Sequence, residues 1–112
     1  MAVPLISPRL RHMSNPLRVI VLIETLPGRG ADQADAYTAL APLVRAEPGC
    51  LRYDMHAVEG DPDRFVLIEE WASAEALQAH DIAPHMREAD LANRAFRAGP
   101  AVVLPLTPAP IA

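Results

Sequence analysis

The order in which hydrophobic periodicity changes along the chain most constrains what it can fold into. Residues 18–26 form a near-continuous run of aliphatic and β-branched side chains, which is typical of a strand covered on both faces. Residues 31–46 instead repeat apolar side chains at helical spacing, with Gly30 or Asp32 available to cap the start. Pro42 lies inside this second run, where we expect it to kink or restart the helix. A strand followed by a helix is therefore predicted.

The next two segments alternate with a period of two residues, which indicates strands. In residues 50–58, one face should carry Leu51, Tyr53, Met55 and Ala57, and the other Cys50, Arg52, Asp54 and His56. In residues 64–71, one face should carry Phe65, Leu67, Glu69 and Trp71. The connection between the two segments is a short acidic turn, which predicts an antiparallel hairpin.

Helical and strand signals alternate once more in the last third of the chain. Ser73 is a good N-cap for a helix that Pro84 should end. A second helical segment is predicted over residues 85–97, and a final strand over residues 101–106. The complete order is β-α-β-β-α-β.

This order is that of a ferredoxin-like α+β domain, a four-stranded antiparallel sheet with helices on one face. The first strand is apolar on both sides, so its outer side needs a partner. A second copy of the chain is the simplest partner, which predicts a homodimer with a dimeric α+β barrel architecture. We assign the domain to residues 16–107, with a disordered or extended segment at 1–15 and a Pro-rich tail at 108–112.

Composition excludes several function classes. The formal net charge is -4, and the sequence shows no basic stripe interleaved with aromatic residues, so nucleic-acid binding is not expected. No apolar run approaches the roughly 18 residues that a membrane helix needs. The single cysteine, Cys50, cannot form an intrachain disulfide and suits a reducing compartment. We therefore expect a cytoplasmic protein whose partners are a small-molecule substrate and its own second copy.

Five short motifs in a fixed order resemble the antibiotic biosynthesis monooxygenase family. The first, EPGCLRY, opens the second strand, and the others follow along the hairpin and the helices after it. The matching residues are Glu47, Pro48, Gly49, Cys50 and Tyr53; Pro62, Arg64 and Phe65; Glu69 and Trp71; Ser73, Ala76, Leu77 and His80; and Pro84 and His85. The resemblance extends over residues 18–106.

The resemblance implies a dimeric α+β barrel and one of several chemistries. Some family members oxidise quinols or polyphenols with molecular oxygen and no bound metal or flavin, others degrade haem, and others process a small signalling carbonyl compound. The haem-degrading branch carries an Asn on the first strand and an axial His about ten residues after the His80 position. Here the first strand has no Asn, and Asp90 stands near the expected His. This departure argues against haem degradation.

The candidate site centres on His80, which can act as a general base toward a phenol or enol. Glu69 is a carboxylate on an apolar strand face and needs a partner, which could be His80, Arg52 or a backbone donor. If the partner is His80, Glu69 would orient the imidazole. Trp71, Tyr53 and His85 are the candidate substrate-binding residues. His80 and His85 are five residues apart across a proline and share no helical face, so no metal and no cofactor site is predicted.

Each candidate also has a purely structural interpretation. His80 could fix the strand-to-helix corner, Trp71 and Tyr53 could pack in the core, and His85 could cap a helix. Our leading hypothesis is a cofactor-independent monooxygenase for a small aromatic, quinol or polyphenol compound. The alternatives are an isomerase or processing enzyme for a small carbonyl metabolite, and a dimeric ligand-binding or stress protein without turnover.

Overall fold

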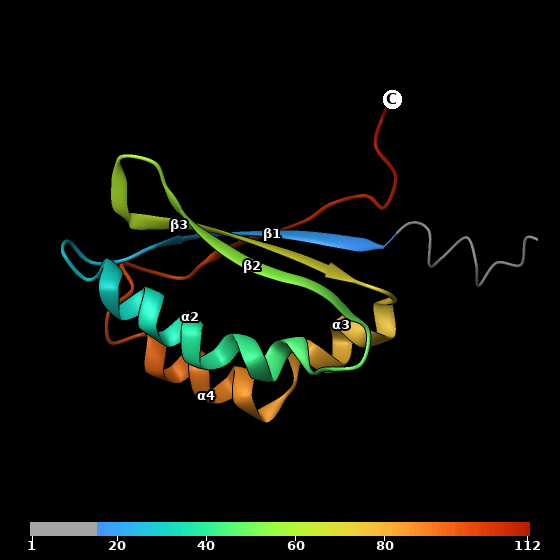
Figure 1. Ribbon diagram of the computed structural model, residues 1–112, viewed down its shortest axis with the longest axis horizontal. Helices are drawn as coiled ribbons and strands as arrows, with labels where there is room; N and C mark the ends of the chain where they lie inside the picture. The colour runs from blue at the N-terminus through green and yellow to red at the C-terminus, as the bar shows by residue number, and fades with distance from the viewer. Residues whose placement is uncertain (1–15) are drawn as a thin grey trace, which may run out of the picture.

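The fold has the predicted order of elements. A computed structural model describes residues 16–112, so the segment predicted at 1–15 lies outside the described residues. The elements are β1 (Leu17–Glu24), α2 (Gly30–Arg45), β2 (Cys50–Val58), β3 (Asp61–Trp71), α3 (Ala74–Asp81), α4 (Pro84–Asn93) and β4 (Val102–Pro105). The sheet order is β2-β3-β1-β4, all antiparallel, and the helices cover one face (Figure 1). The ferredoxin-like α+β fold is confirmed.

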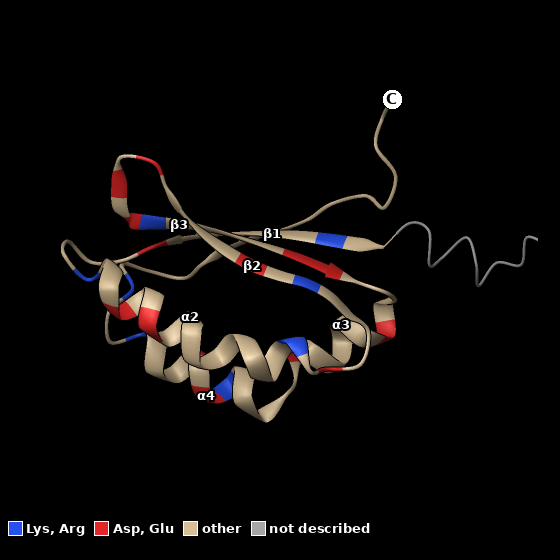
Figure 2. Ribbon diagram, in the orientation of Figure 1, with Lys and Arg blue, Asp and Glu red and all other residues tan. Residues whose placement is uncertain are grey.

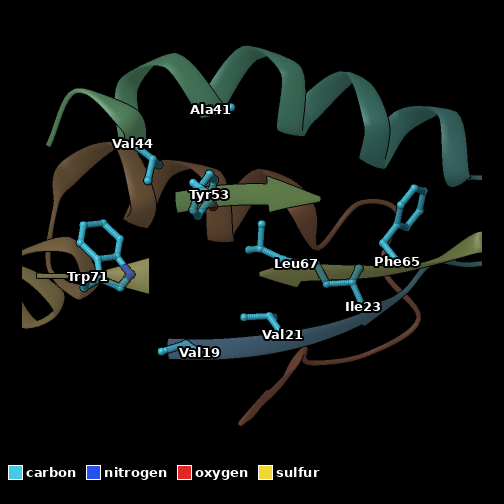
Figure 3. Close-up of a cluster of buried hydrophobic side chains, with 9 residues drawn as sticks. All are labelled: Val19, Val21, Ile23, Ala41, Val44, Tyr53, Phe65, Leu67 and Trp71. Carbon is cyan, nitrogen blue, oxygen red and sulfur yellow. The ribbon is translucent and has the colours of Figure 1, made fainter. Parts of the chain in front are cut away.

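The core lies between the inner face of the sheet and the helices. On β3 the predicted alternation holds, because Phe65, Leu67, Glu69 and Trp71 are all buried. Their neighbours are aliphatic side chains of β1 and α2 (Figure 3), and the cluster as a whole comprises Val19, Val21, Ile23, Ala41, Val44, Tyr53, Phe65, Leu67 and Trp71. Glu69 is thus a carboxylate on an otherwise apolar face.

The predicted faces of β2 are wrong at the start of the strand. Cys50 pairs with Trp71 and Arg52 pairs with Glu70, so Leu51 is an extra residue in a β-bulge. The bulge inverts the alternation there. Leu51 is exposed, and Cys50 packs against the core cluster.

The start of α2 is capped by a distant residue, and not by Gly30 or Asp32 as expected. Both oxygens of the Asp63 carboxylate accept backbone N–H groups, from Gly28 at 2.9 Å and Gly30 at 3.0 Å. A Cβ on Gly30 would lie 1.9 Å from the Pro62 carbonyl oxygen, so only glycine permits this approach. The helix then continues through Pro42 to Arg45 as one element, without the predicted restart.

Two other boundaries differ from the sequence-based expectation by three residues or more. Strand β3 begins at Asp61, three residues before the predicted start, and α4 ends at Asn93 instead of continuing to Arg97. After α4 the chain turns and pairs with the end of β1, where Thr25 and Arg97 form an isolated bridge. This pairing stops the helix because the Ala98 N–H donates to the Glu24 carbonyl of β1 and the Phe96 carbonyl accepts the Leu26 N–H of the turn after it.

The outer face of the sheet is apolar and uncovered in the single chain. Ile20 and Leu22 lie on this face of β1, opposite Ile68 and Val66 of β3 and Leu104 and Val102 of β4. Leu22 is 40% exposed, so within one chain only the inner face of β1 is covered. The prediction that a second copy covers the outer face stays a prediction. The middle of β1 carries no charge between Arg18 and Glu24 (Figure 2).

The loop before β2 is held against α3 by a glycine contact. Gly49 has a φ of +83°, and a Cβ there would lie 2.6 Å from the Cβ of Ala76. Its carbonyl accepts the Ala72 N–H at 2.8 Å. The close approach fixes the position of the residues just before Gly49, including Glu47.

We predict that Gly49→Ala destabilises the fold more than Gly60→Ala does. Gly60 has a φ of +80° with nothing within 4 Å of an added Cβ, so its variant carries only the backbone cost of about 1–2 kcal/mol. Gly49→Ala adds the contact with Ala76 to a similar backbone cost. The measurement is the free energy of unfolding in urea, and equal losses in the two variants would contradict this account of the loop.

Candidate active site

His80 lies buried at the end of α3. The helix begins where predicted, because the Ser73 hydroxyl accepts the Ala76 N–H at 3.1 Å. Two turns later His80 faces the sheet and is only 2% exposed. A buried imidazole needs partners for both ring nitrogens, and the structure supplies acidic ones on both sides.

Trp71 and Glu69 form one wall around this imidazole. The indole Nε1–H of Trp71 donates to Glu69 Oε1 at 2.9 Å, and the same oxygen lies 3.7 Å from His80 Nε2. The rings of Trp71 and His80 are 4.5 Å apart between centroids. Glu69 thus lies close to His80 as expected, but at 3.7 Å the two are not hydrogen-bonded. The hydrogen bond that Glu69 accepts comes from the Trp71 indole.

Glu47 is one of the site residues that sequence reasoning missed. Its carboxylate lies 3.0 Å from His80 Nδ1 through Oε2, and the same oxygen is 2.6 Å from His85 Nε2. Glu47 sits in the loop that Gly49 packs against α3, so this contact depends on tertiary packing. The only sequence signal was its place at the head of the EPGC motif.

A neutral imidazole in this geometry has a defined tautomer. A carboxylate only accepts hydrogen bonds, so Nδ1 donates to Glu47 and the Nε2 lone pair is left facing Glu69. A proton that arrives at Nε2 produces an imidazolium between two carboxylates. The arrangement can therefore accept a proton and stabilise the resulting charge.

Burial shifts the acid–base behaviour of two neighbours of His80. Burial raises the pKa of Glu69 above its ordinary value, although the Trp71 N–H and the charge of His80 oppose this shift. Burial likewise raises the pKa of the Tyr53 phenol, with a further contribution from the Glu69 charge. The Tyr53 ring meets His80 edge-on at 5.8 Å between centroids. Tyr53 therefore stays a neutral phenol at the wall of the site.

A pocket of about 240 Å³ extends from His80 along the inner face of the sheet. Apolar side chains from all four strands and all three helices make up more than half of its lining. Its polar wall consists of Gln33, Tyr37, Tyr53, Glu69, His80, Asp81, Asp90, Asn93 and Arg97. An apolar cavity with a few convergent polar groups is the usual form of a small-molecule site.

The pocket includes some predicted site residues and omits others. His80, Glu69 and Tyr53 line it, whereas Trp71 and His85 are not among the described lining residues. Trp71 is fully buried behind the imidazole, and His85 lies on the far side of Glu47. Trp71 therefore contacts Glu69 and His80, and His85 contacts Glu47, but neither side chain forms part of the cavity wall.

The far end of the pocket brings in polar residues that sequence analysis did not single out. Gln33 precedes Tyr37 by one helical turn, and Met86, Asn93 and Arg97 recur at spacings of seven and four. The sequence signal that could have identified these residues was a polar side chain at the helical spacing of the buried positions. No group of three or more potential metal ligands occurs within residues 16–112, and no helix there is long and apolar enough to cross a membrane.

Comparison with known proteins places these features in a family. A family model described as antibiotic biosynthesis monooxygenase matches residues 16–90. The probable quinol monooxygenase YgiN of Escherichia coli K12 is 37% identical over 81 residues, which is 63% of this chain and 78% of that protein.

Solved structures agree with the fold. PA3566 from Pseudomonas aeruginosa has 34% identity and a TM-score of 0.77, covering 85% of this chain and 95% of that one. Rv0793 from Mycobacterium tuberculosis has 28% identity and a TM-score of 0.77, covering 87% of this chain and 98% of that one. The likeness thus spans nearly the whole described domain.

The raised pKa of Glu69 predicts a pH-dependent effect of Glu69→Gln on stability. The folded protein holds more protons than the unfolded chain between the unfolded pKa of about 4.3 and the higher folded pKa. The unfolding free energy of the wild type therefore loses the Glu69 contribution as pH rises through this window, and the variant does not.

The quantity to measure is the variant-minus-wild-type difference in unfolding free energy by urea titration from pH 4 to pH 8. It should rise with pH and level off above the folded pKa of Glu69. Glu88→Gln, which removes an exposed carboxyl on α4, is the matched control. A difference that falls as pH rises would mean that the carboxylate is stabilised, and not penalised, by its site.

Proposed function

Because the chain belongs to the antibiotic biosynthesis monooxygenase family, we propose that it is an oxidoreductase that oxygenates a small aromatic, quinol or polyphenol compound with molecular oxygen. The name of its relative, a probable quinol monooxygenase, supports the substrate class. The observation that carries the proposal is the buried His80, whose Nδ1 contacts Glu47 and whose side chain lines an apolar pocket. We place the enzyme in the cytoplasm, where the free thiol of Cys50 is stable.

Proton removal is the first step that these residues would perform. A substrate hydroxyl in the pocket gives its proton to His80 Nε2, and the Nδ1–H bond to Glu47 keeps the ring in the accepting tautomer. The imidazolium then lies between Glu47 and Glu69. The substrate is left as an electron-rich phenolate, which can reduce oxygen directly and needs no bound cofactor.

The electron balance closes without an external reductant. A hydroquinone plus O2 gives a hydroxyquinone plus H2O: one oxygen atom forms a new C–O bond at a ring carbon that loses its hydrogen. The other oxygen atom leaves as water with two substrate hydrogens. All four electrons come from the substrate, so the protein has only to bind, orient and move protons.

The remaining candidate residues take positioning or wall roles in this proposal. Tyr53 is a substrate-contacting wall, because it lines the pocket beside His80. Trp71 donates a hydrogen bond to the Glu69 carboxylate and packs its ring against the His80 imidazole. His85 fixes the Glu47 carboxylate. Trp71 and His85 thus act on the substrate only through the groups they hold.

The active form in this proposal is a homodimer. The outer sheet face around Leu22 presents neighbouring apolar side chains from β1, β3 and β4 and has no covering layer in one chain. Contiguous exposed apolar surface of this kind marks an interaction site. Packing two such faces would complete the dimeric α+β barrel.

We expect His80→Ala to lower the rate of oxygen uptake by about 100- to 10,000-fold, the usual contribution of a general base. The assay is an oxygen electrode with a panel of hydroquinones and polyphenols. Gln78→Ala, an exposed change on the same helix, is the control and should behave as wild type. Wild-type uptake no faster than in the protein-free solution would contradict the proposal and favour a proton-transfer enzyme or a binding protein.

We expect Leu22→Glu to convert the dimer to a monomer, because it places a charge at the centre of the outer face. Light scattering after gel filtration gives the mass. Leu43→Glu changes a leucine on α2 that is also exposed and lies away from this face, and it should leave the mass unchanged. A wild-type protein that elutes as a monomer at micromolar concentration would disprove the dimer.

A further inference from the structure

The pocket has a second polar end, far from His80. Glu69 lies opposite Val19 of β1, whereas Arg97 lies opposite Thr25, six residues further along the strand. At about 3.3 Å per residue, Val19 and Thr25 are about 20 Å apart along the chain. The inner side chains of Val21 and Ile23 lie between them and line the pocket. Figure 1 shows the same separation, with α3 at one end of the sheet and the end of α4 toward the other.

The backbone around Arg97 is fixed to the sheet on both sides. The Leu26 N–H donates to the Phe96 carbonyl at 2.8 Å, and the Ala98 N–H donates to the Glu24 carbonyl at 2.9 Å. The side chain is anchored as well, since its Nε donates to Gln33 Oε1 at 2.9 Å. Gln33 is itself only 2% exposed. The guanidinium therefore has a defined place at the pocket wall.

This guanidinium has donors left over. Among the described residues, the only side-chain hydrogen bond of Arg97 is the one from Nε, so its two Nη groups have no such protein partner. Burial lowers the pKa of Arg97, opposed chiefly by the nearby charge of Asp90. An arginine stays charged in proteins, so what remains is a partly desolvated cation with open donors. A carboxylate is, with phosphate, one of the two groups that such a fork binds through two parallel hydrogen bonds.

The charges of the pocket would orient an anionic ligand. Glu69 and Asp81 lie at the His80 end, and Glu47 stands behind the imidazole. Arg97 is the only Lys or Arg among the described lining residues, although Asp90 lies near it. An anionic group is therefore repelled from the His80 end and attracted to the other.

We propose that Arg97 and Gln33 form a subsite for a carboxylate on the substrate, which is then a phenolic acid whose hydroxyl points toward His80. The identity of the reacting end rests on the proposed function; the carboxylate subsite does not. A cavity of about 150 Å³ holds one benzene ring, so about 240 Å³ suits one or two rings with polar substituents at opposite ends.

The test is anaerobic binding by calorimetry at pH 7.5, with two probe pairs that differ only in charge. They are 4-hydroxybenzoate against 4-hydroxybenzamide, and 6-hydroxy-2-naphthoate against 6-hydroxy-2-naphthamide. The wild type should bind at least one acid about 10-fold or more tightly than its amide, as a charge-assisted hydrogen bond would give. This comparison needs no variant.

Variants then assign the preference to Arg97. Arg97→Met should remove the preference for the acid and leave the amide within about two-fold, and Arg97→Lys should keep part of it, because the charge remains. Arg87→Met removes an exposed positive charge from α4 and should change neither Kd. Thermal unfolding confirms that each variant is folded.

The outcomes separate this proposal from the oxygenase proposal. No preference for either acid, binding of no probe, or a preference that survives Arg97→Met in folded protein would overturn the subsite. A preference for the acid without any oxygen uptake would support the subsite and count against the oxygenase. Oxygen uptake that depends on His80 but is indifferent to the carboxylate would do the reverse.

Discussion

The site depends on one constraint, the burial of an imidazole and a carboxylate beneath a short helix. His80 and Glu69 lie on surfaces that otherwise carry aliphatic side chains, and polar groups buried there need partners. The Trp71 indole satisfies Glu69, and Glu47 satisfies His80. Both partners are at chain reversals, one at a strand end and one in a loop. The close packing of α3 on that loop, which Gly49 permits, is therefore as much part of the chemistry as the histidine.

The two faces of the sheet result from the same alternation along β1, but one face borders the pocket and the other is an exposed apolar surface. Inner residues of β1 such as Val21 line the pocket, while outer residues such as Leu22 form the uncovered apolar surface. A small aliphatic domain of this kind has one layer of helices and cannot cover both faces. The pocket and the proposed dimer interface thus both follow from the alternation of inner and outer apolar side chains along β1.

Local pattern predicted the elements well where partners are near in sequence, and less well where they are distant. The alternation over residues 64–71 identified the buried face of β3, and Ser73 correctly marked the start of α3. The bulge at Leu51 was not predictable, because an extra residue leaves no mark in the alternation until the partner strand is aligned. The residue that caps α2 was not predicted for a similar reason, because Asp63 lies 33 residues after Gly30 in the sequence.

The amino-acid sequence was enough to predict the order of strands and helices, the face on which Glu69 lies, and the family. Those properties follow from periodicity and short motifs, which are local. Three contacts became visible only in the folded chain: Glu47 binds His80, Trp71 supports the site instead of lining the pocket, and Arg97 donates to Gln33. These contacts depend on how loops close and helices settle on the sheet, where displacements of about an ångström decide which side chain reaches which. The pattern of residues along the sequence does not specify those distances.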